Sequence, residues 1–443
     1  MRAPKREFRY FIRTFGCQMN ESDSEKIAGL LRRTGGTRTE RPEEADLIVV
    51  NTCAVREKSE QKLFSYLGRM ARIKKKKSVR IGVIGCVAQI RGREILEDCE
   101  TVDYVLGPDN AAELPALFHK DDAGKCISTS WSEEWHEIPC GLILHESPVS
   151  AYLTVMEGCD NFCAYCIVPY ARGREKYRPI SFILEEAREL ARRGFLEIQL
   201  LGQNVNSYRD PGSGKTFPEL LKEISNIAGI AWVRFITSHP KNFSPETAEV
   251  MAAHGKICKQ LHLPLQSGSS AVLKKMERGY SAEDYLNTVS LLRRLMPEIS
   301  LSTDIIVGFP GESERDFEDT LAVVREVRFI NIFSFRYSPR PRTAAAKLEN
   351  PISEKEKQRR LEEIQRLQKS IQLENHSLQV GRRMRVLCSG HARKTPDLFT
   401  GRNEGHQVVN FRSGEECAAR FVDVRITGFG PYSLLGEHTP SRS

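Results

Sequence analysis

The stretch Ala151–Val168 reads AYLTVMEGCDNFCAYCIV and joins an apolar run to a loop with three cysteines. The run Ala151–Met156 is typical of a buried strand, and Cys159, Cys163 and Cys166 follow it with the spacing CxxxCxxC. Iron–sulfur cubes are normally held by four cysteine thiolates, so a loop with three leaves one iron free to bind another ligand. The stretch therefore predicts a reactive site directly after a strand.

Zinc is the other metal that such a loop suggests. A zinc site needs a fourth ligand or an activated water, and His136 or His145 is available for that role. Structural zinc knuckles usually pair two CxxC elements, whereas this chain has one. We therefore favour iron–sulfur over zinc.

The composition is that of a globular protein of about three domains, with 443 residues, 12 cysteines and a formal net charge of +8. Residues 1–13 lack the apolar core of a signal peptide, and no run reaches the roughly 18 apolar residues of a membrane span. We expect a cytoplasmic protein without a membrane segment, where cysteines stay reduced and serve as ligands rather than disulfides. The positive charge is a weak indication of a polyanionic partner.

Residues 7–122 alternate apolar runs with helical patterns, which predicts a doubly wound parallel α/β domain. Ser22 and Glu25 have the spacing of a capping box for the first helix. The expected strands are Phe8–Phe15, Leu47–Asn51, Arg80–Gly85 and Val102–Leu106, and the expected helices are Asn20–Arg33 and Glu57–Arg72.

Three further cysteines each follow one of these strands. Cys17, Cys53 and Cys86 lie just beyond the carboxyl ends, where an open α/β sheet places its ligand crevice. Three buried, inert thiols are the alternative interpretation. The repeated placement favours a shared site.

Residues 120–145 show little periodicity and are interpreted as a connector. Residues 145–376 then repeat a strand–helix pattern six times, which predicts an incomplete (β/α)6 barrel that is open on one side. The strands are expected near Ala151, Ile198, Trp232, Gln260, Ser302 and Ile332, with helices such as Ser181–Arg193 and Arg315–Arg328, and Glu354–Gln379 as a charged bridging helix.

Residues 378–441 change to short β-like runs, which predict a small β-barrel of the OB type. Basic residues alternate there with aromatic ones, a pattern of nucleic-acid binding modules; a dimerisation domain is the alternative. The runs are Met384–Cys388, Val408–Phe411, Cys417–Ile426 and Tyr432–Leu435; the basic residues include Arg382, Arg383, Arg385, Arg393, Lys394 and Arg402, and the aromatic ones His391, Phe399 and Phe411.

The CxxxCxxC loop resembles that of the radical S-adenosylmethionine (SAM) superfamily. The resemblance implies a 4Fe-4S cluster on Cys159, Cys163 and Cys166, whose fourth iron binds SAM and which breaks SAM to a 5′-deoxyadenosyl radical. It also implies that Tyr165 packs on the adenine and that loops after later strands contact SAM. These loops contain Gln203 and Asn204 (LGQNVN), Gln266, Ser267 and Gly268 (HLPLQSGS), and the segment 304–311 (DIIVGFPG).

Nearly the whole chain is similar to the methylthiotransferase family of radical SAM enzymes. The supporting motifs are TFGCQMN at 14–20, NTCAVR at 51–56 and GCVAQ at 85–89, ahead of the radical core and a TRAM-like barrel. The resemblance implies a second 4Fe-4S cluster on Cys17, Cys53 and Cys86 that carries sulfur. It also implies that one SAM supplies a methyl group and another the radical, which together insert a methylthio group at a C–H bond.

The sequences at 158–175 and 201–208 look most like family members that act on tRNA with isopentenyladenosine at position 37. The resemblance further implies a reducing electron donor, and a self-contained chain of three domains suggests a monomer. Two departures are Tyr177 and Arg342, where the family usually has serine and glycine. The alternatives are the methylthiotransferases for threonylcarbamoyladenosine 37 or a ribosomal aspartate, and a non-catalytic iron–sulfur protein that binds RNA.

Overall fold

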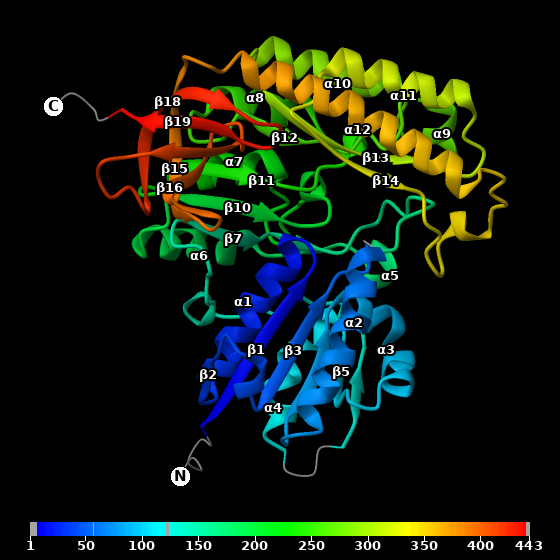
Figure 1. Cartoon of the computed structure of the whole chain (residues 1–443), viewed down its shortest axis with the longest axis vertical. Helices are drawn as coiled ribbons and strands as arrows, with labels where there is room; N and C mark the ends of the chain where they lie inside the picture. The colour runs from blue at the N-terminus through cyan, green and yellow to red at the C-terminus, as the bar shows by residue number, and fades with distance from the viewer. Residues whose placement is uncertain (1–6, 56, 121–123, 440–443) are drawn as a thin grey trace.

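The computed structural model describes residues 7–55, 57–120 and 124–439 (Figure 1). Arg56 of the NTCAVR motif, and residues 121–122 and 440–441 at the ends of two expected domains, lie outside the described residues. Three modules follow one another along the chain: an N-terminal α/β sheet, a central strand–helix repeat and a C-terminal β-barrel. Among the described residues, no helix has the length and apolarity needed to cross a membrane.

The N-terminal module is a six-stranded parallel sheet in the order β2-β1-β3-β4-β5-β6, which confirms the expected class. Two three-residue edge strands, β2 and β6, were not expected, and β6 lies in the stretch interpreted as a connector. Three residues are too few to display an alternating pattern. The strands are β1 (Phe8–Phe15), β2 (Gly36–Arg38), β3 (Leu47–Thr52), β4 (Arg80–Ile84), β5 (Tyr104–Leu106) and β6 (Cys126–Ser128).

Helices cover both faces of this sheet. Ile27, Leu31 and Leu114 pack on one face, and Leu63 and Ile95 pack on the other. The helices are α1 (Gln18–Arg33), α2 (Glu57–Lys74), α3 (Cys86–Asp98) and α4 (Leu114–Phe118).

The expected capping box at Ser22 and Glu25 was wrong, because α1 begins earlier and Cys17 is its N-cap residue. Both side chains are buried and contact the central module instead. The Ser22 hydroxyl lies 3.4 Å from that of Thr154, and the Glu25 carboxylate lies 3.1 Å from His145 Nδ1.

The central module contains the six expected strands in two halves, β7-β10-β11 and β12-β13-β14. A backbone hydrogen bond of 3.0 Å from the Cys258 N–H to the Val233 carbonyl joins the halves. In the described part of the chain β7 does not pair with β14, so the barrel is open on one side. The strands are β7 (Ser150–Thr154), β10 (Glu197–Leu201), β11 (Trp232–Phe235), β12 (Gln260–His262), β13 (Ser300–Val307) and β14 (Asn331–Arg336).

Alternate residues of these strands face the helices or the barrel interior. On β13, Leu301 and Ile305 belong to the main core under the helices, whereas Asp304 meets His262 inside the barrel. The helices are α6 (Ile180–Arg192), α7 (Phe217–Ser225), α8 (Pro245–Ala253), α9 (Ser270–Lys275), α10 (Ala282–Leu295) and α11 (Glu314–Val327).

The charged helix α12 (Glu354–Ser377) is more than a bridge, because it packs against β14 and α11 (Figure 1). Ile364 and Ile371 are buried in the core of the central module. The Gln368 amide donates a hydrogen bond of 3.1 Å to the Phe329 carbonyl. The apolar strip on this helix is narrow, and the surrounding charges obscured it in the sequence.

The C-terminal module is a closed barrel in the order β15-β16-β17-β19-β18. Phe399 and Phe411 stack at 5.8 Å inside its core, so the expectation that they present surfaces to nucleic acid was wrong. Strand β16 was not expected. The strands are β15 (Arg383–Ala392), β16 (Thr395–Asn403), β17 (Val408–Arg412), β18 (Arg420–Phe429) and β19 (Leu434–His438).

A buried arginine docks the barrel onto the central module. Arg234 of β11 is 2% exposed and donates to Glu197 at 2.6 Å. Its two other nitrogens donate to the carbonyls of Asn403 and Glu404, at 2.8 and 2.6 Å, in the loop between β16 and β17.

Candidate active site

The CxxxCxxC loop lies at the carboxyl ends of the central strands. It follows β7 and the two-residue strand β8 (Met156–Glu157), which pairs with β9 (Lys176–Tyr177), and it leads into the short helix α5 (Val168–Arg172). The Gly158 N–H donates to the Gln203 side chain at 2.5 Å, which ties this loop to the loop after β10. The Ala164 N–H donates to the Met276 carbonyl at 2.9 Å. Neighbouring loops therefore fix the motif from both sides.

The structure brings Cys159, Cys163 and Cys166 together. Burial, together with the nearby Cys163 and Cys159, raises the pKa of Cys166 to about 12. Burial also raises the pKa of Cys159. The thiols of Cys159 and Cys166 are therefore protonated in the protein alone, and a cluster that binds their thiolates must displace those protons.

Two residues that the sequence did not single out hold Cys163. Arg278, buried on the loop after α9, donates to the Cys163 sulfur at 3.3 Å. Its other nitrogens donate to Tyr280 and to the Pro264 carbonyl, each at 3.0 Å. His239 Nε2 lies 3.7 Å from the same sulfur. Burial, with Arg278 next, lowers the pKa of His239 to about 2, so its ring is neutral.

Several predicted SAM contacts lie in this pocket of loops. Tyr165 lies near Cys163, Cys166 and Arg278, and burial raises its pKa, so its hydroxyl stays neutral. Gln203 contacts the cysteine loop, as described above. Buried polar atoms without a partner among the described residues occur on three consecutive loops here: Asn204 Oδ1, both amide atoms of Asn206, Ser238 Oγ and Gln266 Oε1. Such atoms are the expected lining of a polar ligand site.

The other two predicted SAM contacts, Ser267 and Gly268, lie against helix α11. Ser267 Oγ lies 3.3 Å from Thr320 Oγ1, and the Gly268 N–H donates to Thr320 Oγ1 at 2.9 Å. A Cβ atom at Gly268 would lie 2.5 Å from the Thr320 backbone, so only glycine fits. These two residues pack the loop after β12 against α11.

The second cysteine set lies at the carboxyl ends of β1, β3 and β4. The hydrogen bond from the Cys53 thiol lowers the pKa of Cys17 to about 6, with help from backbone N–H groups at the start of α1 and from Arg172. The same hydrogen bond and burial raise the pKa of Cys53. Burial raises the pKa of Cys86. The three thiols therefore lie near one another at this edge of the sheet.

A buried amide pair braces this site. The Asn20 side chain donates to Asn51 Oδ1 at 3.0 Å, and the Asn51 side chain donates back to the Asn20 carbonyl at 2.9 Å. Gly85 has φ +93, and a Cβ atom there would lie 2.3 Å from Asn51 Oδ1. Glycine is thus required directly before Cys86.

Arg172 connects the two cysteine sets. It ends α5, six residues after Cys166, and it is 4% exposed. Its Nε donates to the Cys86 sulfur at 3.2 Å, and its Nη2 donates to Asp23 at 2.5 Å. Its Nη1 is buried and has no partner among the described residues. A donor is therefore left free beside the second cysteine set.

Among the described residues, no three His, Cys, Asp or Glu side chains gather closely enough to hold one ion. His145, a candidate zinc ligand, contacts Glu25 instead. In a cube each cysteine binds a different iron, so its ligands stand further apart than those of a zinc ion.

Comparisons with known proteins agree with this arrangement. Residues 9–107 match the model described as "Uncharacterized protein family UPF0004", and residues 153–324 match the radical SAM superfamily. The chain is 46% identical to the tRNA-2-methylthio-N(6)-dimethylallyladenosine synthase of Geobacter metallireducens over 96% of this chain and 97% of that protein. It is 43% identical to the synthase of the same name from Acetivibrio thermocellus, over 96% and 90%. The chain belongs to this methylthiotransferase family.

A solved structure supports the fold alone. The radical SAM methyltransferase TsrM from Kitasatospora setae is 16% identical, has a TM-score of 0.56 and matches 77% of this chain and 74% of its own. As a member of the radical SAM methylthiotransferases, the present enzyme has a 4Fe-4S cluster and SAM as cofactors and acts on tRNA. The residues described at the CxxxCxxC loop fit both cofactors in number and chemistry.

The two departures from the family pattern lie near the central loops. Tyr177 donates its hydroxyl to Glu175 and packs edge-on against Tyr208, with ring centroids 6.0 Å apart. Arg342 has φ +69, in the left-handed region. Backbone in this region favours glycine on steric grounds.

Proposed function

We propose that this enzyme methylthiolates carbon 2 of N(6)-isopentenyladenosine at position 37 of tRNA. The observation that carries the proposal is the pair of cysteine sets, each at the carboxyl edge of a parallel sheet and linked through Arg172. Full-length similarity to synthases of that name supports the choice of substrate. The proposal assigns three functional domains: an N-terminal methylthiotransferase domain at residues 7–122, a radical SAM core at residues 145–376 and a TRAM domain at residues 378–441.

In this proposal Cys159, Cys163 and Cys166 hold the cluster that binds SAM. Arg278 donates a hydrogen bond to the Cys163 sulfur, and the neutral His239 adds no charge beside it. Tyr165, Gln203, Asn204 and Gln266 contact SAM, whereas Ser267 and Gly268 position their loop through α11. When bound, the cluster and SAM supply the electron, the radical and the methyl group.

Cys17, Cys53 and Cys86 hold a second 4Fe-4S cluster in the proposal. The donor set fits, because the three thiols lie at the edge of one sheet and Cys17 has a pKa of about 6, so that its thiolate forms readily at neutral pH. Arg172 contributes a donor to Cys86 and keeps Nη1 free for a sulfur ligand. The chain acts as a monomer that receives electrons from a separate reducing partner.

The substrate is tested by nucleoside analysis of tRNA from cells that lack this protein. We expect loss of the methylthio group and accumulation of plain isopentenyladenosine. Retention of the methylthio-isopentenyl nucleoside, with loss of the methylthio-threonylcarbamoyl nucleoside, would instead identify the rival substrate.

A second experiment tests the proposal that the protein is an enzyme rather than an RNA-binding protein with structural clusters. The reconstituted and reduced protein is incubated with SAM alone. We expect 5′-deoxyadenosine to form; its absence under conditions that retain the full iron content would contradict the catalytic assignment.

A further inference from the structure

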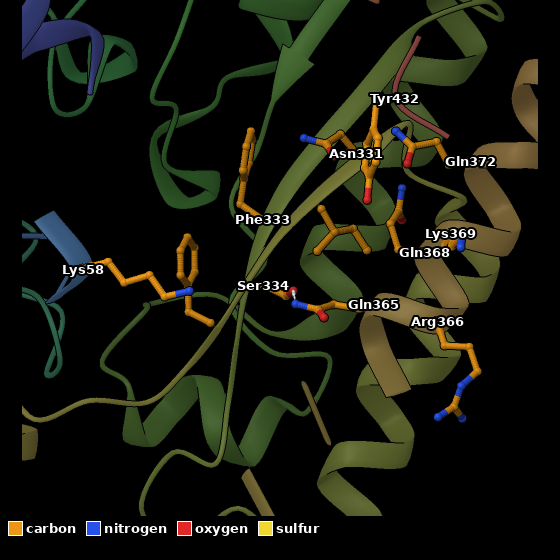
Figure 2. A pocket seen from close by; sticks show the side chains of 12 residues that line it. Lys58, Asn331, Phe333, Ser334, Gln365, Arg366, Gln368, Lys369, Gln372 and Tyr432 are labelled. Atoms are coloured by element: carbon orange, nitrogen blue, oxygen red, sulfur yellow. Dashed lines mark hydrogen bonds between the residues drawn. The ribbon is translucent and has the colours of Figure 1, made fainter. Parts of the chain in front are cut away.

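A groove of about 740 Å³ follows strand β14 and is lined by all three modules (Figure 2). Lys58 of α2 lies on one side, and the side chains of α12 lie on the other. Tyr432, in the turn between β18 and β19, closes one end. A single ligand in the groove therefore contacts all three modules.

The groove lies at the open side of the incomplete barrel. Strand β14 pairs with β13 on one side only in the described chain, so its other edge presents unpaired backbone groups. Phe333 points from this strand into the barrel interior, where its ring lies 5.8 Å from that of His262. A ligand in the groove thus adjoins the interior of the barrel.

The charge of the groove is entirely positive. Lys58, Arg366 and Lys369 are its only charged lining residues, and none forms an ion pair with any residue that the structure describes. By contrast, Arg360 of the same helix α12 pairs with Glu312 at 2.7 Å and with Glu356 at 2.9 Å. The cations of the groove are therefore left available for an anionic ligand.

Aromatic and amide groups complete the lining. Phe333 is 43% exposed and Tyr432 is 80% exposed, which is unusual for such large rings. Gln368 is 6% exposed, yet its Oε1 atom has no partner among the described residues. A buried acceptor without a donor indicates a ligand with hydroxyl or N–H groups.

We propose that this groove binds a single-stranded segment of the substrate tRNA. The three cations contact phosphates, Tyr432 stacks on a base, and the Gln368 acceptor receives a ribose hydroxyl or a base N–H. The proposal rests on the proposed function, because it takes tRNA as the substrate. An acidic protein, such as the electron donor, also suits the charge but not the exposed rings and the buried acceptor.

The test compares two double variants of the reconstituted full-length enzyme. Arg366→Gln with Lys369→Gln removes two groove cations, and Arg188→Gln with Lys222→Gln removes two exposed cations from α6 and α7. Affinity for isopentenyl-tRNA is measured at several salt concentrations. For the groove variant we expect weaker binding and a salt slope smaller by about 1.4, at about 0.7 for each lost phosphate contact. The control should keep the wild-type slope.

The substitution Tyr432→Ala provides a second test. The fold tolerates this substitution because the ring is 80% exposed. We expect tRNA affinity to fall at least about fivefold, the lower range for a lost base stack. SAM cleavage without tRNA should be unchanged.

The proposal is overturned if the double variant Arg366→Gln with Lys369→Gln and the variant Tyr432→Ala both bind tRNA with the affinity and salt slope of the wild type. Unchanged tRNA binding with slower reduction by an acidic flavoprotein donor would overturn it as well, and would assign the groove to a protein. The proposed function fails separately, if the wild-type enzyme does not modify the tRNA that it binds.

Discussion

Replacing Arg172 by glutamine tests whether this residue serves the second cysteine set or only the fold. The side chain of Arg172 is 3% exposed and that of its partner Asp23 is 13% exposed. Removing one member of a buried ion pair costs about 3–5 kcal/mol. Because Asp23 retains some contact with water, we expect a loss near 3 kcal/mol, measured as a lower thermal midpoint of the protein without clusters.

The same substitution removes a charged donor from the Cys86 sulfur. A hydrogen bond to a charged group contributes about 1.5–3 kcal/mol, which for one electron corresponds to about 65–130 mV. The reduced cluster carries the extra negative charge, so it is the form that loses more stabilisation. We therefore expect the reduction potential of the second cluster to become more negative by up to that amount.

Arg178→Gln is the matched control. Arg178 is equally buried and pairs with Glu186 at 2.6 Å and with Glu137, but it contacts no cysteine among the described residues. Both variants should be destabilised, and only Arg172→Gln should shift the potential, as followed by electron paramagnetic resonance during a redox titration. If the two variants lower stability alike and neither moves the potential, Arg172 has a structural role only.

Three other substitutions probe separate parts of the chain. Cys17→Ala should lower the iron content by about four atoms per chain while SAM cleavage stays measurable, and an unchanged iron content would contradict the second cluster. Arg342→Gly should raise the free energy of unfolding by up to about 1 kcal/mol, since φ +69 strains any other residue. Burial, then Arg234 and Arg402, lowers the pKa of His406 in the folded state, so below pH 6.5 only the unfolded chain gains the proton. The free energy of unfolding of the wild type should therefore decrease by about 1.4 kcal/mol for each unit by which the pH falls below 6.5. The decrease should be less steep in His406→Asn. Parallel pH profiles of the two proteins in thermal melts would refute this.

The positions of the six candidate cluster ligands followed from the sequence because strand ends are local features. A run of apolar residues marks a buried strand, and in a parallel sheet all carboxyl ends meet at one edge. Cys17, Cys53 and Cys86 are therefore close in space although they are far apart in the chain. The same reasoning applied to the central strands, whose order along the chain is also their order in the barrel.

Residues that act through long-range contacts were not predictable in this way. Arg278 and His239 reach Cys163 from loops after other elements, and no local pattern distinguishes them from surface residues. Phe399 and Phe411 resembled stacking platforms because a five-stranded barrel alternates inward and outward residues, and the sequence does not state which face is inside.

The arrangement of the two modules places both cysteine sets near the boundary between them. The strands β1, β3 and β4 end toward the central module, where α5 carries the chain from Cys166 to Arg172. A helix of this length and one arginine side chain span at most about 25 Å, which limits the distance between the two sets. Two ion pairs across this boundary are largely buried: Lys176 and Asp109 are 9% and 4% exposed and lie 2.7 Å apart, and Arg172 and Asp23 are 3% and 13% exposed. Buried pairs add little net stability, but they require an exact partner geometry. We infer that they hold the two modules in a fixed orientation, so that a base held against one set remains within reach of the other.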